Sequence, residues 1–138
     1  MQIASVVAST ALAVVLFAPG SLHADDGHSS VKVTTLMRQP LPDYPGKEGV
    51  LVAVEFAPGH ADAAHRHPGH AFVHVLEGSV EMQMEGGELQ TLKQGDTFYE
   101  DPKDTHPVGR NVSKTEPAKL LVFFLADQKV PLVLPPAH

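Results

Sequence analysis

From residue 31 to residue 125 the chain alternates between short runs rich in β-branched residues and turns rich in Gly and Pro. In the run 50–56, apolar residues at every second position share one face while Glu55 lies on the other, which is the two-residue period of a strand. Further runs of this kind occur at 31–36, 71–76, 79–84, 88–92 and 97–100. No segment after residue 24 shows a convincing helical period. The pattern predicts one all-β domain, a sandwich or a barrel.

The last two segments of the chain differ from these alternating runs. Residues 119–125 read KLLVFFL and are apolar on both faces, which predicts a central strand buried on each side. The tail that follows contains three Pro among its last nine residues. Because Pro cannot donate a ladder hydrogen bond, we expect the tail to lie across a sheet edge or against a partner subunit.

Composition excludes several classes of function. The 138 residues include 10 Lys plus Arg and 16 Asp plus Glu without a basic run, which argues against nucleic acid as a partner. With no Cys, the chain has no disulfide, no thiolate zinc site, no iron–sulfur cluster and no cysteine nucleophile. Any metal must therefore be held by nitrogen and oxygen atoms.

The N-terminal segment predicts export. Residues 3–18 carry no charge and are shorter than the roughly 20 residues of a spanning helix, and small residues predict cleavage after Ala24. A buried N-terminal helix or a membrane tether is the alternative. We expect a periplasmic or secreted protein with no stable membrane span after cleavage. The predicted organisation is a signal peptide at 1–24, an N-terminal strand and loop at 25–49, a barrel at 50–126 and a Pro-rich tail at 127–138.

Five of the nine His fall within one short stretch, at positions 60, 65, 67, 70 and 74. In an extended chain, residues two apart point the same way, so His65 and His67 can reach one metal ion. His106 follows a turn where a neighbouring strand could bring it beside that pair. Three neutral nitrogens make a site for a divalent transition ion with open positions. The alternative is a surface His-x-His without metal.

Two groups of residues resemble the motifs of the cupin family. The first group is Gly59, then His65-Arg66-His67 after five intervening residues, then Glu77-Gly78. The second, with looser spacing, is Gly95, Pro102, His106 and Asn111. The resemblance covers roughly residues 50–125. It implies a double-stranded β-helix, or jelly-roll, cupin barrel with a metal at its mouth.

The sequence departs from the family at its Glu ligand, which would fall three or four residues after His67, where Ala71 and Phe72 stand. Counting by twos from His67 places residue 71 on the ligand face, so the metal would be bound by His65, His67 and His106 alone. In the competing interpretation the Pro68-Gly69 turn resets the phase and makes His70 the fourth ligand. We favour the three-His site.

The remaining polar residues of this region receive structural interpretations. We expect His74 to be a wall residue, His60 a solvated loop residue, Glu77 a solvated turn residue, and Arg66 a surface residue paired with an acid. The following apolar residues are expected in the core first and in a substrate pocket second: Val73, Val75, Met82, Met84, Phe98 and Phe123.

The leading functional hypothesis is a metal-dependent small-molecule enzyme of dioxygenase type. Iron is the first choice of metal, with Mn, Ni, Zn and Cu as alternatives. The second hypothesis is a non-catalytic metal or small-ligand binding cupin, and the third is a structural dimer whose His cluster responds to pH. We expect a homodimer, because small cupins often pair through sheet edges and terminal segments.

Overall fold

The computed structural model describes residues 31–136, and every regular element within them is a strand. The strands are β1 (Val31–Pro40), β2 (Lys47–Phe56), β3 (His70–Glu77), β4 (Ser79–Gln83), β5 (Gln90–Lys93), β6 (Thr97–Glu100), β7 (Val108–Asn111) and β8 (Ala118–Asp127).

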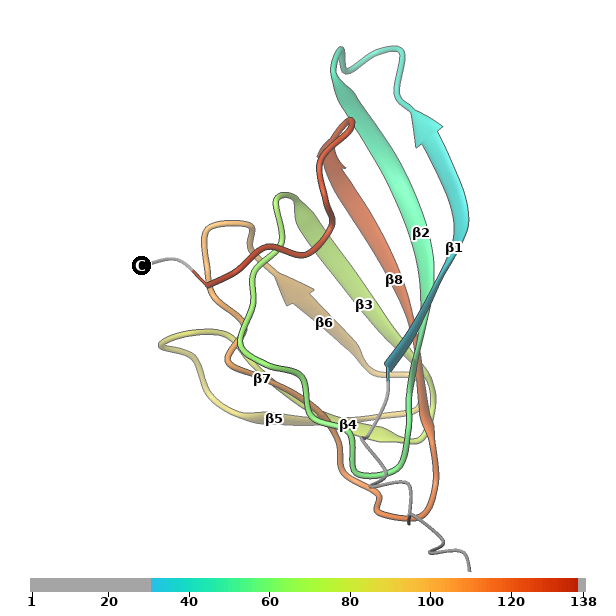
Figure 1. Cartoon of the computed structure of the whole chain (residues 1–138), viewed down its shortest axis with the longest axis vertical. Helices are drawn as coiled ribbons and strands as arrows, with labels where there is room; N and C mark the ends of the chain where they lie inside the picture. The colour runs from blue at the N-terminus through green and yellow to red at the C-terminus, as the bar shows by residue number, and fades with distance from the viewer. Residues whose placement is uncertain (1–30, 137–138) are drawn as a thin grey trace, which may run out of the picture.

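The strands form two antiparallel sheets that face each other (Figure 1). One sheet has five strands in the order β1-β2-β8-β3-β6, and the other has three in the order β5-β4-β7. This arrangement is consistent with the jelly-roll double-stranded β-helix, and the all-β prediction is confirmed. Strand β7 was not predicted, because its sequence VGRN has no apolar alternation. Its place is fixed by pairing with β4.

The core fills the space between the sheets. Alternate residues of each strand point inward, and the inward faces of β2, β3, β4 and β8 are largely apolar. Burial of each Val, Leu or Phe side chain contributes about 1.5–3 kcal/mol. The buried cluster comprises Val50, Val52, Phe56, Ala71, Val73, Val75, Val80, Met82, Leu92, Phe98, Ala118, Leu120, Val122 and Phe124.

Strand β8 is central in its sheet, as its sequence predicts, but it is not buried on both faces. Its inward residues are buried, whereas Phe123 on the outer face is 40% exposed. Within residues 31–136, no second layer of structure covers that outer face. An apolar run in the sequence does not show whether both faces of its strand are covered.

The turn before β3 is fixed by close backbone packing. A Cβ on Gly69 would stand 2.2 Å from the carbonyl oxygen of Leu125, so only glycine fits there. The turn therefore packs on the end of β8 and sets His70 as the first residue of β3.

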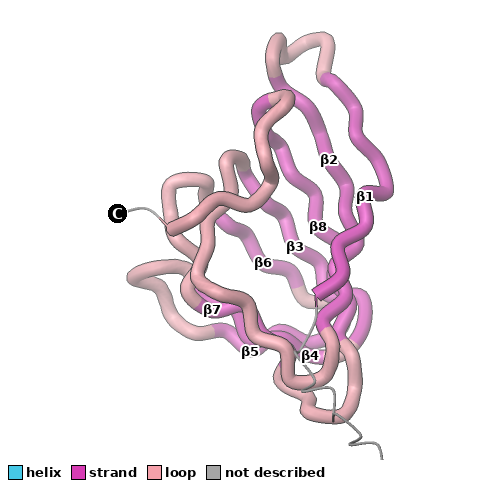
Figure 2. Tube along the Cα trace, in the orientation of Figure 1, coloured by secondary structure: helices cyan, strands magenta, loops and turns pink. Residues whose placement is uncertain are grey.

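The tail after β8 folds back on its own chain. The backbone of Leu134 pairs with that of Arg66 through two hydrogen bonds of 2.8 and 3.0 Å. Figure 2 shows this segment running beside the loop that precedes β3. The tail therefore contacts the loop that carries the His-x-His pair rather than a sheet edge, and its contact with a partner subunit stays a prediction.

Within residues 31–136, no helix has the length and apolar character required to cross a membrane. The predicted signal peptide at 1–24 lies outside the described residues.

Candidate functional site

Three imidazole rings converge between the sheets, as the spacing of the residues predicts. The backbones of His65 and His106 form an isolated bridge, with the amide of His106 donating to the carbonyl of His65 at 2.6 Å. The ring of His65 lies 4.9 Å from that of His67 and 5.2 Å from that of His106, centroid to centroid. Residues separated by about forty positions thus share one cluster.

A carboxylate that the sequence analysis missed completes this cluster. Glu100 lies on β6, is 4% exposed, and places Oε2 2.9 Å from His67 Nε2 and Oε1 3.5 Å from His106 Nε2. Its register partner on β3 is Ala71, the residue that stands where the family motif has Glu. The acid of this cluster therefore comes from the neighbouring strand β6, and the three-His ligand set stays a prediction.

The alternation of residues in β6 could have predicted that this acid is buried. Phe98 is apolar and buried, and Glu100 two residues later must point to the same side. A Glu in phase with a core Phe is a candidate buried acid, because a buried carboxylate needs a partner.

Backbone carbonyls orient all three rings. A carbonyl oxygen only accepts hydrogen bonds, so each Nδ1 carries the hydrogen, and each neutral ring then presents a lone pair at Nε2. The Nδ1 atoms of His65, His67 and His106 donate to the carbonyls of Ala63 at 2.9 Å, Leu132 at 2.5 Å and Gln83 at 2.7 Å. Partners of this kind hold metal-binding imidazoles in orientation.

The carboxylate of Glu100 lacks a hydrogen-bond donor unless a positive charge joins the cluster. Its Oε2 is buried without such a partner, since a neutral His67 has its only N–H at Nδ1. Protonation of His67 at Nε2 turns the 2.9 Å contact into an ion pair. A proton or a metal ion therefore supplies the charge that the buried acid requires.

The pKa directions agree with this pairing. Burial is the largest single influence on both groups, but their mutual attraction together with neighbouring hydrogen bonds and charges outweighs it. The pKa of His67 is raised above its ordinary value, and the pKa of Glu100 is lowered. The pKa of His65 is lowered, chiefly by burial and also by the neighbouring rings, which favours its neutral, metal-binding form.

These residues fit a transition metal in their donor chemistry, with three imidazole nitrogens and one carboxylate. Within residues 31–136, no group of three or more His, Cys, Asp and Glu side chains is already arranged as a metal-binding group. Glu100 instead lies against His67 as an ion-pair partner. The fit therefore rests on the donor types and on the unpartnered oxygen.

The structure does not bring His70 into the cluster. Because β3 begins at His70 and alternates from there, Ala71 points inward while His70 is exposed on the outer face. Its Nδ1 lies 2.6 Å from the hydroxyl of Tyr99. His74 shares this outer face, and Glu77 is exposed as predicted, 3.4 Å from Lys119.

Two other expectations are wrong. His60 is 6% exposed rather than solvated, with Nε2 2.7 Å from Asp62 Oδ1 and its ring beside Phe56. The loop that carries it forms backbone hydrogen bonds with β7, which the sequence analysis did not predict. Arg66 donates from Nε to the carbonyl of Pro135 at 3.1 Å, and its described hydrogen bond is to the tail rather than to an acid.

A cavity of about 600 Å³ opens beside the cluster. This volume lies within the range of about 300–1,000 Å³ of small-molecule sites. Its polar side chains are Asp62, His65, His67, Glu100 and His106. Its apolar wall includes Val31, Val33, Val54, Val122, Leu132 and Pro135.

Comparison with known proteins gives one similar sequence and several similar structures. The chain is 36% identical over 81 residues to Oryzines biosynthesis cluster protein J of Aspergillus oryzae (strain ATCC 42149 / RIB 40), covering 59% of this chain. It spans 44% of that relative's length.

Two solved structures share the fold. DMSP lyase DddQ from Ruegeria pomeroyi DSS-3 has a TM-score of 0.62 and 23% identity, covering 86% of this chain and 58% of that one. The polyketide cyclase RemF from Streptomyces resistomycificus has a TM-score of 0.58 and 20% identity, covering 78% of this chain and 72% of that one.

The family model of the cupin domain matches residues 52–124, which run from β2 to β8 and include all four residues of the cluster. The match spans more than half of the chain and agrees with the sheet arrangement. The chain belongs to the cupin family.

Proposed function

We propose that this chain is an exported, single-domain metalloenzyme of dioxygenase type that acts on a small molecule. Its metal ligands would be His65, His67, His106 and Glu100. The observation that carries the proposal is the convergence of three oriented Nε2 lone pairs on a buried carboxylate oxygen without a donor. Iron is the first choice of metal, because imidazole and carboxylate ligands suit it.

When bound, a divalent transition metal would supply Lewis acidity and, for iron, one-electron redox chemistry. The residues of the chain perform the remaining tasks. The carbonyls of Ala63, Leu132 and Gln83 hold the rings in orientation. Glu100 balances positive charge and can accept a hydrogen bond at Oε2. The apolar wall of the cavity limits the access of water to a bound molecule.

The similar structures support an enzyme by analogy of fold. A lyase and a polyketide cyclase are built on this architecture, and both are named for reactions on small organic molecules. Their identity to this chain is below 25%, so the reaction type rests on the site itself.

Metal analysis tests the site first. We expect the purified, untagged protein to hold about one metal ion per chain, measured by plasma mass spectrometry. His67→Ala and Glu100→Gln should each reduce this occupancy at least tenfold, because each removes a ligand. His70→Ala is the matched control, since it removes an imidazole from the outer face of β3. Equal occupancy in all four proteins would refute the proposed ligand set.

Oxygen uptake tests the reaction type. The iron-loaded protein should consume oxygen with one of the flavonols, diketones or thiols screened in an oxygen electrode, and Glu100→Gln should not. Stoichiometric iron without oxygen uptake would contradict the dioxygenase assignment.

One observation favours a second candidate, a non-catalytic binding cupin. The ion pair of His67 and Glu100 neutralises the buried carboxylate without a metal ion. The cavity could therefore bind a ligand in metal-free protein. Ligand binding to metal-free protein, without turnover in the metal-loaded form, would support this candidate.

Export is tested separately. Mass spectrometry of protein recovered from the exporting host should show an N-terminus at or near Asp25. An intact Met1 in the soluble cytosolic fraction would contradict it.

A further inference from the structure

The cavity has a polar side and an apolar side. Its acid Glu100 comes from β6, the last strand of the five-stranded sheet, whereas Val31 and Val33 come from β1, the first. Strands lie about 4.8 Å apart, so β1 and β6 are separated by about 19 Å measured along the sheet. A molecule in the cavity thus meets the imidazoles at one end and aliphatic side chains along the rest.

The charge of the lining constrains the ligand further. Among the described residues that line the cavity there is no Lys or Arg, while Asp62 and Glu100 are both acids. A compact dianion or a polyhydroxylated molecule would lose its hydration and find few partners on these walls. An apolar body gains about 25 cal/mol for each Å² that it buries.

We infer that the ligand of this cavity is a molecule with an apolar body, aromatic or aliphatic, and a single oxygen head group that is neutral or singly charged, such as a phenol or an enol. The head group faces the His–Glu cluster and the body lies along β1, β2 and β8. The role of the head group as a metal partner rests on the proposed function, whereas the preference for an apolar body does not.

Calorimetry with three probes tests the ligand class on zinc-loaded and on metal-free protein. Zinc is used because it is not redox-active. We expect 2-naphthol to bind at least tenfold more tightly than oxalate or glycolate to both forms. Oxalate or glycolate binding as tightly as 2-naphthol to zinc-loaded protein would overturn the inference. If the protein does not retain zinc but keeps the preference for 2-naphthol, the proposed function fails and the ligand class stands.

A substitution on β1 sharpens the test. Val33 lines the cavity and is 59% exposed, so Val33→Arg should fold and add a cation to the apolar wall. We expect this variant to lose at least fivefold in affinity for 2-naphthol and to gain in affinity for oxalate. Thr34→Arg is the matched control, because the next residue of the strand faces away from the cavity. Equal effects of the two substitutions would overturn the placement of the apolar body.

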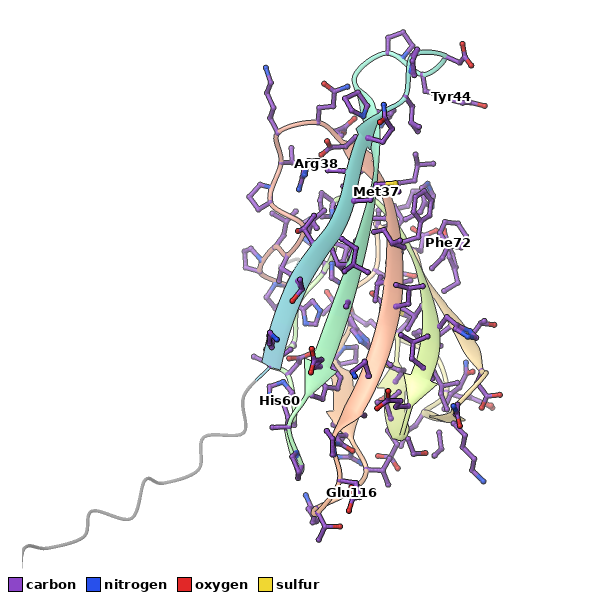
Figure 3. The ribbon with its side chains drawn as sticks, turned by 90° about the vertical axis from the view of Figure 1, so that its right-hand side faces the viewer. Met37, Arg38, Tyr44, His60, Phe72 and Glu116 are labelled. Carbon is purple, nitrogen blue, oxygen red and sulfur yellow. The ribbon has the colours of Figure 1, made fainter. Side chains whose placement is uncertain are left out.

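A different observation supports an independent inference about the outer face of the five-stranded sheet. A row of large apolar side chains crosses all five strands, each the register partner of the next: Met37, Leu51, Phe123, Phe72 and Tyr99. All except Leu51 are more than 39% exposed. Figure 3 shows Met37 and Phe72 on this same face. Apolar rows of this size on a soluble domain mark an interaction surface.

A second row on that face carries charges of alternating sign. It runs Lys32, Glu55, Lys119, Glu77 in register across β1, β2, β8 and β3. When the order of the four strands is reversed, every charge in this row meets a charge of the opposite sign. A two-fold axis parallel to the strands, between β2 and β8, would therefore set each Lys of one copy against a Glu of the other.

We propose that this face binds a second copy of the chain, with the two five-stranded sheets packed face to face. The two-fold axis places Phe123 over Leu51 of the other copy and Glu55 over its Lys119. Self-complementary charge of this kind is what an isologous interface requires. The exposed outer face of β8 would then be covered, as the apolar sequence of that strand predicts.

Light scattering on the full mature chain tests the dimer. We expect wild type to have twice the mass of one chain, and Phe72→Glu to be a folded monomer. Tyr44→Glu, in the exposed loop between β1 and β2, is the control and should stay dimeric. A dimer that survives Phe72→Glu would overturn the proposal. A monomeric wild type would also overturn it, because a different molecule would then have to cover this face.

Charge exchange tests the two-fold axis itself. Lys119→Glu and Glu55→Lys each place like charges opposite one another, so each variant alone should dimerise at least fivefold more weakly than wild type. When the two variants are mixed, every facing pair is again of opposite sign, and a heterodimer should form. Failure of the mixture to form a heterodimer would contradict the proposed axis.

Discussion

The inner and outer faces of the five-stranded sheet carry the same kinds of polar residue in different states. On the inner side, Glu100 of β6 and His67 of the loop before β3 are buried, and they are held by the backbone and by each other. On the outer face, His70 is exposed beside Tyr99, and Glu77 forms a solvated pair with Lys119. Within β6, strand alternation decides that Glu100 points into the cluster and that the neighbouring Tyr99 lies on the surface.

The largest expected difference between the faces is in the stability of their ion pairs. Glu100→Ala removes the charge-assisted pair and lets the buried His67 lose its Nε2 proton, so we expect a loss of about 1.5–3 kcal/mol at pH 6 in metal-free protein. Glu77→Ala breaks an exposed pair and should cost less than about 1 kcal/mol. Urea unfolding of both variants measures the contrast. Similar losses would show that the inner pair is not held as described.

A carboxylate added to the inner face should be harmful. Ala71 is fully buried and is the register partner of Glu100, so Ala71→Glu adds volume and a second negative charge there. We expect a loss of about 1–3 kcal/mol from overpacking alone and weaker, not tighter, metal binding. Thermal melts and zinc titration measure the two effects. Tighter binding would restore the three-His interpretation made from the sequence.

The inner pair also predicts a pH dependence in metal-free protein. The pKa of Glu100 is lowered from an ordinary value of 4.5, so its contribution is present above that pH and is lost as the pH falls through the folded value. The pKa of His67 is raised from 6.5, so its contribution is present below that pH and is lost as the pH rises through the folded value.

The stability difference between wild type and Glu100→Gln should therefore be greatest between about pH 4.5 and pH 6.5. His65, whose lowered pKa acts in the opposite direction, is present in both proteins, so the effect of its burial cancels in this difference. Urea unfolding across the pH range measures it. A difference that keeps growing above pH 7 would contradict the assignment of the proton to His67.

Removal of the C-terminal tail should affect the inner cluster and leave the outer face unchanged, with a smaller effect than the substitutions above. Removing residues 130–138 deletes the Leu132 carbonyl that orients His67, so we expect zinc affinity to fall about tenfold. The dimer should persist, because the tail lies against the loop of its own chain and away from the outer row. Loss of the dimer with unchanged zinc affinity would reverse this assignment.

The sequence contains the strands and the His cluster but not the register between strands. Alternation in 50–56 and in β6 is local, so the inward positions of β2 and β6 can be read directly. That Glu100 lies opposite Ala71 depends on the pairing of β3 with β6, which no local pattern encodes. His60 was misassigned for the same reason, because its burial arises from contacts of its loop with β7.

Anomalous diffraction from crystals of the zinc-loaded protein tests the central claim most directly. We predict one peak per chain, about 2.0–2.2 Å from the Nε2 atoms of His65, His67 and His106 and from a carboxylate oxygen of Glu100. A peak beside His70 and Tyr99 on the outer face, or no peak within the barrel at full zinc loading, would contradict it.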